Sequence, residues 1–131
     1  MTEATAKLNS YRQSPRKVRL VARLIKGKKV ADAKNQLTFT TKRATGPLHK
    51  LLNSAIANAK DLGMDLNNLF VKSVRVDGGK ILYRRRPVSR GAAHPIKKRT
   101  SHIALILKEK EEKITEPKKD SENKISKSKK K

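Results

Sequence analysis

The sequence lacks cysteine and tryptophan and contains only four aromatic residues, Tyr11, Phe39, Phe70 and Tyr83. Without cysteine the chain can form no disulfide, no thiolate metal site and no cysteine nucleophile, which fits a reducing compartment. Four scattered aromatic rings are too few for the stacking platform on which proteins that bind single-stranded nucleic acid hold their bases. If the chain binds nucleic acid, we expect it to contact the backbone of an already folded molecule.

Long apolar runs are also missing. The N-terminal stretch MTEATAKLNSYRQ has no apolar centre and does not resemble a secretory signal. No run approaches the roughly 18 consecutive apolar residues that a membrane-spanning helix needs. We therefore expect no membrane span and a cytoplasmic protein, or an organellar one if a transit segment has already been removed.

Acidic residues are scarce relative to basic ones. The chain has 34 Lys and Arg against 11 Asp and Glu, a formal net charge of +23. Residues 109–131 hold nine Lys and six acids, so 25 basic and five acidic residues lie in residues 1–108. A fold with this excess repels itself until a polyanion neutralises it. Nucleic acid is the commonest such partner, because phosphate contacts dominate its affinity for proteins, and an anionic membrane is the other candidate.

The apolar pattern of residues 1–108 predicts a small α+β body. Ser14 and Pro15 are typical of a helix start, with Ser14 as the capping side chain, and Gly27 is typical of its end. A third helix begins at Pro47 or at a kinked turn before it, and it ends at Gly63. The predicted elements are a weak strand over residues 4–12, helices over 15–26, 30–37 and 48–62 with a break at 38–41, and strands over 70–76 and 100–108. They fit three helices packed on one face of a three-stranded antiparallel sheet.

Residues 77–99 are too long for an ordinary loop in so small a domain. Ile81, Leu82 and Tyr83 favour a strand, so we expect the outer half of a long β-hairpin spanning about residues 70–107. Gly78 and Gly79 are interpreted as a bend, and a broad irregular tip is marked by Pro87, Gly91 and Pro95. A protruding hairpin is marginal in water by itself, so an outside surface must order it.

Residues 109–131 change abruptly to Lys, Glu, Ser and Asn. So few apolar residues predict a flexible, disordered Lys-rich tail. Its possible roles are a localisation signal, a solubilising segment or an additional rRNA contact, and the sequence does not choose among them.

Nothing in the sequence predicts catalysis, a metal or a cofactor. His49, His94 and His102 lie on separate predicted elements without a neighbouring acid. Gly78-Gly79 is followed by no helix and no GK[ST] motif, so it is not a phosphate-binding loop. The five acids of the body are scattered, which argues against an enzyme that acts on RNA.

Three segments in the right order resemble one family. They are RQSPRKVRLVARLIKGKKVADA (residues 12–33), KLLNSAIANA (50–59) and KKRTSHIALIL (97–107). Together they resemble bacterial large-subunit ribosomal protein L-twenty-two, and the similarity runs from about Lys7 to Leu107. The resemblance implies a structural protein that binds 23S-type rRNA across several domains and acts early in subunit assembly. It also implies a hairpin that lines the nascent-polypeptide exit tunnel near its constriction, neighbouring large-subunit proteins as partners, and macrolide antibiotics near the hairpin tip.

The charge pattern and the resemblance together assign the interaction residues. The expected rRNA contacts are Ser14, Arg16, Lys17, Arg19, Lys28, Lys29, Lys80, Arg84, Arg85, Arg86, Arg90, Lys97, Lys98, Arg99, Thr100, Ser101 and His102. The expected tunnel-lining tip, which would meet the nascent polypeptide, is Arg84, Arg85, Arg86, Pro87, Val88, Ser89, Arg90, Gly91, Ala92, Ala93 and His94.

Two binding alternatives remain. An architectural DNA-binding protein would also be basic and use β-arms, and it would dimerise and insert an apolar wedge; the only candidate wedge here is Pro87-Val88. A cationic membrane-active protein would need bulky apolar and aromatic helix faces, which the predicted helices lack.

Overall fold

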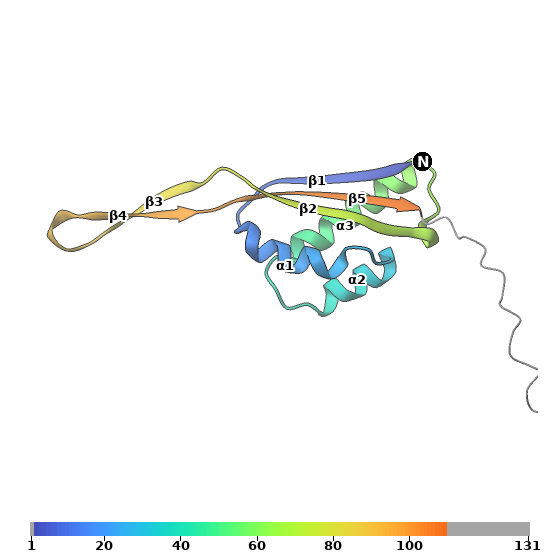
Figure 1. Ribbon diagram of the computed structural model, residues 1–131, viewed down its shortest axis with the longest axis horizontal. Coiled ribbons are helices and arrows are strands. Elements are labelled where there is room, and N and C mark those ends of the chain that lie inside the picture. The colour runs from blue at the N-terminus through green and yellow to red at the C-terminus, as the bar shows by residue number, and fades with distance from the viewer. Residues whose placement is uncertain (1, 110–131) are drawn as a thin grey trace, which may run out of the picture.

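A computed structural model describes residues 2–109 (Figure 1). Over these residues the chain forms three α-helices and five β-strands, as the sequence predicted for an α+β body with a hairpin. The elements in chain order are β1 (Glu3–Tyr11), α1 (Pro15–Ile25), α2 (Val30–Phe39), α3 (Thr45–Asp61), a 3-10 turn (Leu66–Asn68), β2 (Leu69–Gly78), β3 (Leu82–Pro87), a second 3-10 turn (Ser89–Gly91), β4 (Ala93–Lys98) and β5 (Ser101–Glu109).

Strand β5 is the centre of an antiparallel three-stranded sheet of order β1-β5-β2. The helices lie on one side of this sheet (Figure 1). Because successive side chains of a strand point to opposite faces, Ile103, Leu105 and Leu107 are buried under the helices. Ala104 and Ile106, between them, lie on the other face and are only half-buried.

The core joins the sheet to apolar stripes on the helices. In α1 the buried residues are Val18, Val21, Ala22 and Ile25, at the three- and four-residue spacing of one helix face. In α3 they include Leu48, Leu52, Ala55 and Ala59, and that helix packs mainly on β1. The β1 residues on that face are small, Ala4 and Ala6, which allows α3 to approach the strand closely.

The outer hairpin, β3 and β4 with their connection, leaves the body as a separate two-stranded ribbon (Figure 1). We call residues 82–98 the arm. Apart from the half-buried Leu82, its side chains are all exposed. The prediction of a long protruding hairpin is confirmed.

The prediction of a broad irregular tip was wrong. The strands pair as far as Pro87 and Ala93, and Pro95 is paired with Arg85 inside the ribbon. A two-stranded ribbon has only edge strands, so a proline can sit there without breaking an internal ladder. The chain reverses over residues 88–92, where Arg90 (φ 59°) and Gly91 (φ 71°) take left-handed conformations and the Val88 N–H donates to the Ala92 carbonyl at 2.9 Å.

The arm is attached to the body through residues 79–81 and 99–102, which pack tightly together and which we call the arm root. The Gly79 N–H donates to the Thr100 carbonyl at 2.9 Å, and the Thr100 hydroxyl donates to the Lys80 carbonyl at 2.7 Å. A Cβ atom at Gly79 would lie 2.5 Å from Thr100 Oγ1 and 2.9 Å from His102 Nε2. Strand β2 ends at Gly78, and Gly79 is required for the close approach of the chain to Thr100 and His102.

Four local predictions need correction. Helix α2 continues through Thr38 to Phe39, so the break begins later than expected, and α3 starts at Thr45, two residues before Pro47. Ser14 occupies the N-cap position without a side-chain capping bond. Its carbonyl accepts from the Lys17 and Val18 N–H groups, as in any helix start. Glu109 belongs to β5 and not to the predicted tail; the rest of that tail lies outside the described residues.

None of the helices within residues 2–109 has the length and apolar character needed to cross a lipid bilayer.

Replacing a fully buried core leucine should destabilise the protein strongly. We expect Leu52→Ala to lower the free energy of unfolding by about 2–5 kcal/mol, because it leaves a cavity between α3 and the sheet. Leu20→Ala on α1, where the side chain is 58% exposed, should change it by less than about 0.5 kcal/mol. Urea denaturation of the full chain at high salt measures both, and equal losses would contradict this assignment of the core.

Replacing Gly79 should disturb the arm root specifically. We expect Gly79→Ala to cost about 1–3 kcal/mol, since its methyl group collides with Thr100 and His102. Gly46→Ala, in the first turn of α3, meets no atom within 4 Å and should be neutral or slightly stabilising. Denaturation midpoints of the two variants, compared with the parent chain, provide the measurement. A stable Gly79→Ala protein would show that the root is loosely packed.

Candidate nucleic-acid interface

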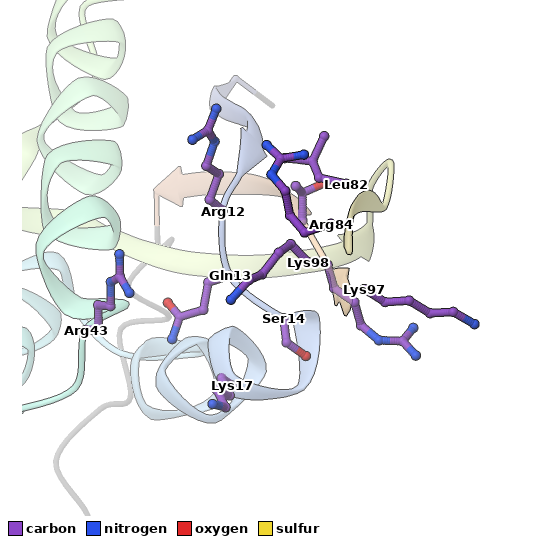
Figure 2. Close-up of a pocket in the computed structure, with 11 residues that line it drawn as sticks. Arg12, Gln13, Ser14, Lys17, Arg43, Leu82, Arg84, Lys97 and Lys98 are labelled. Carbon is purple, nitrogen blue, oxygen red and sulfur yellow. The ribbon is translucent and has the colours of Figure 1, made fainter. Parts of the chain in front are cut away.

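A cleft of about 860 Å³ lies where the arm meets the N-terminus of α1 (Figure 2). Seven of its eleven lining residues are Lys or Arg, and none is acidic. The lining residues are Arg12, Gln13, Ser14, Lys17, Arg43, Leu82, Arg84, Lys97, Lys98, Arg99 and Thr100. This is the arrangement expected for binding a polyanion.

Three segments far apart in the sequence build the cleft. The β1–α1 connection and the start of α1 supply Arg12, Gln13, Ser14 and Lys17, and the root and arm supply Leu82, Arg84 and residues 97–100. The third segment, the α2–α3 connection, supplies Arg43. The Tyr11 hydroxyl donates to the Arg43 carbonyl at 3.3 Å, which ties that connection to the end of β1.

The first turn of α1 adds a favourable dipole. A helix N-terminus carries unpaired backbone N–H groups and a partial positive charge, so it attracts anions. Here the Ser14 hydroxyl makes no capping bond and lines the cleft. Gln13 Oε1 beside it is buried without a hydrogen-bond partner.

A second, smaller hollow of about 490 Å³ adjoins the first. Its lining residues are Ser14, Pro15, Arg16, Arg19, Gly78 and Arg99, so Ser14 and Arg99 belong to both hollows. Arg19 donates from Nε and Nη2 to the Val76 carbonyl at 3.1 and 2.8 Å. This guanidinium therefore anchors α1 to the end of β2, beside the arm root, as well as adding charge.

The acids of the described residues lie mostly away from these hollows. Glu3 and Glu109 are at the opposite end of the sheet, where Lys72 pairs with Glu3 and the Asp65 N–H donates to the Glu109 carboxylate at 2.6 Å. The hydrogen bond from Lys72 lowers the pKa of Glu3 below its usual value. Asp77, near the arm root, is paired with Arg75 at 2.7 Å. The positive charge of the cleft is thus left without a neutralising partner along its lining.

The structure gathers some of the residues expected to contact RNA and disperses others. Ser14, Lys17, Arg84, Lys97, Lys98 and Arg99 line the cleft, and Arg16 and Arg19 line the adjoining hollow. Lys28 and Lys29 lie beside the start of β2, where Lys28 bonds to Gln36. Lys80, Arg85, Arg86 and Arg90 are exposed at the root and along the arm.

Two of the residues expected to contact RNA are buried. Thr100 is 4% exposed and its hydroxyl is used inside the arm root, while Ser101 is fully buried on the helix side of β5. The Thr100 side chain supports the arm root, and the RNA contact expected of these two residues stays a prediction. The His102 side chain is hydrogen-bonded within the protein, with Nδ1 accepting from the Ser10 N–H at 3.1 Å.

The sequence did not single out Arg12, Gln13 or Arg43 as interaction residues. Arg12 and Gln13 directly precede the predicted helix start, which was a usable local signal. Arg43 carries no such signal, because only the packing of the α2–α3 connection against the end of β1 brings it to the cleft.

All eleven residues assigned to the arm tip, residues 84–94, are exposed. Within residues 2–109 no three His, Asp or Glu side chains converge as a metal site would require. His49 lies near the Asn53 amide on α3, and His94 is on β4. The chemistry that this surface offers is the binding of anionic oxygens by ammonium and guanidinium groups.

Residues 6–108 match the family model described as ribosomal protein L22p/L17e. Similar proteins, each named large ribosomal subunit protein uL22, occur in Christiangramia forsetii (50% identity, 79% of this chain and 80% of the relative) and Desulfitobacterium hafniense (50%, 86% and 99%). Another, from Citrifermentans bemidjiense, is 48% identical over 82% of this chain and 98% of its own length. The cleft and the arm both fall inside the matched region. The chain belongs to the ribosomal protein L22p/L17e family.

Proposed function

We propose that this protein is a structural constituent of the large ribosomal subunit and that it binds the rRNA through the basic cleft and the arm. The observation that carries the proposal is the cleft itself, in which seven cations and no acid surround the junction of body and arm. The names of the similar proteins support the same assembly. This function places the protein in the cytoplasm, with the ribosome.

The side-chain chemistry suits an RNA backbone. Arg has a planar fork that matches phosphate oxygens, and it stays charged at every physiological pH. Binding to several phosphates releases condensed counterions, which makes the affinity large at low salt and steeply salt-dependent. The cleft opens between three chain segments, so an RNA strand bound there would contact all of them at once.

The arm also fits a role inside an RNA assembly. A two-stranded ribbon with exposed side chains buries almost no apolar surface of its own and is marginal in water. We propose that the arm reaches along the nascent-polypeptide exit tunnel near its constriction, with residues 84–94 at the tunnel wall beside the nascent chain and near the macrolide site. The body would then contact several rRNA domains and neighbouring large-subunit proteins and would join early in assembly.

The proposal includes no catalytic step. His102 is engaged by the backbone of Ser10, and His49 and His94 are on different elements. Such isolated groups do not form the acid–base or nucleophile–base pairs that hydrolysis requires.

Neutralising the cleft should weaken RNA binding far more than an equal loss of charge elsewhere. We expect the triple variant Arg12→Ala, Arg43→Ala and Lys98→Ala to lose affinity for large-subunit rRNA. Its slope of log K against log salt should fall by about 0.7–0.9 per lost phosphate contact, or about 2–3 in all. Filter binding over a series of salt concentrations measures the affinity and slope together.

The matched control removes three exposed lysines remote from the cleft, Lys26→Ala, Lys34→Ala and Lys60→Ala. It lowers the net charge by the same amount as the cleft variant. Its salt slope should change by less than about 0.7–0.9, the value of one phosphate contact. Two results would count against the proposal: equal effects of the two triple variants, or equal affinity of the parent chain for large-subunit rRNA, unrelated RNA and duplex DNA of the same length. Preference for the DNA would favour the architectural alternative.

A further inference from the structure

The arm has two faces of different composition. In an antiparallel pair, partner residues lie on the same face and successive residues alternate. The register pairs Leu82 with Lys98, Arg84 with Ile96 and Arg86 with His94, and these six residues form what we call the cleft-side face. The opposite face consists of the remaining pairs, Tyr83 with Lys97, Arg85 with Pro95 and Pro87 with Ala93.

The cleft-side face is continuous with the basic cleft. Leu82, Arg84 and Lys98 belong to this face and also line the cleft. Lys97 is the one residue of the opposite face in the lining. Figure 2 shows the Lys98 side chain extended toward Gln13, whereas the Lys97 side chain extends away on the other side of the ribbon.

The two faces also differ in charge and in residue type. The cleft-side face carries three permanent cations, Arg84, Arg86 and Lys98, with His94 next to Arg86 in the register. Residues of one face two positions apart along a strand are separated by about 6.8 Å, so Arg84 and Arg86 can bind neighbouring phosphates of one strand. The opposite face has two cations and is otherwise formed by Tyr83, two prolines and an alanine.

We propose that the rRNA backbone continues from the cleft along the cleft-side face of the arm as far as Arg86 and His94, and that the opposite face is turned away from RNA. This inference rests on the proposed function and adds to it which side of the arm meets RNA. Arg84, Arg85 and Arg86 are adjacent in sequence and identical in chemistry, yet they divide between the two faces.

Two neighbouring arginines make a matched experimental pair. Arg85 and Arg86 are both exposed, both lie in β3, and neither lines the cleft. Arg86→Ala should weaken binding to large-subunit rRNA and reduce the salt slope by about 0.7–0.9, the value of one phosphate contact. Arg85→Ala should reduce the affinity and the slope by clearly less than Arg86→Ala does. Both variants keep the folded core intact because neither side chain is buried.

A second measurement removes no charge. The chain has no cysteine, so a single introduced thiol is unique. Tyr83→Cys reports on the opposite face and Ile96→Cys on the cleft-side face, at positions that are 58% and 38% exposed. With rRNA bound, alkylation of the thiol at position 96 should slow markedly, while alkylation at position 83 should continue at the rate of the free protein.

The outcomes separate this inference from the proposed function. Equal slopes for Arg85→Ala and Arg86→Ala, a larger effect of Arg85→Ala, or protection of both thiols would overturn the two-face assignment. The proposed function would still stand if the cleft variants lose rRNA binding as expected. Unchanged binding in the cleft triple variant would instead overturn the proposed function, and a protected thiol at position 96 could not restore it.

Discussion

Uncompensated positive charge at the junction of body and arm is the constraint on which the rest of the structure depends. Seven like-charged side chains converge there from three segments, and their repulsion opposes the packing that brings them together. Three acidic side chains are engaged elsewhere: Glu3 with Lys72 and Glu109 with the Asp65 N–H at the far end of the sheet, and Asp77 with Arg75 beside the root. A bound polyanion would lower the repulsion among these cations and so stabilise this conformation.

The apolar core of the body and the hydrogen bonds of the arm root offset the repulsion among these cations. One core runs from α1 and α3 to the central strand β5, and the returning strand of the arm, β4, leads directly into β5. The arm root adds short-range geometry to this support. The absence of a side chain at Gly79 leaves room for the Thr100 hydroxyl, which donates to the Lys80 carbonyl. His102 on β5 accepts a hydrogen bond from the Ser10 N–H near the end of β1. The connection that carries Arg12 and Gln13 is thereby coupled to the base of the arm.

The alternation of side chains along a strand distributes the charges of the arm between two faces. Three consecutive arginines look equivalent in a linear sequence, but a strand turns each one to the face opposite its neighbour. A run that seems to be a uniform basic patch becomes one face continuous with the cleft and another that is richer in proline. This distinction has no counterpart in net charge or in the spacing of basic residues.

The sequence by itself determined the three helices, the strands, the protruding hairpin and its basic character, because helical and strand periods and charge excess are local properties of the chain. Local signals also produced the errors. Ser14 has a capping residue's identity without its bond, and Pro95 reads as a turn residue although it lies inside a ribbon whose edges tolerate it. Only the tertiary structure decided that Arg43 joins Arg12 at one cleft, that Thr100 and Ser101 face inward, and which arginines of the arm share a face. These facts depend on distances between segments far apart in the chain and on strand register, and the packing of the core sets both.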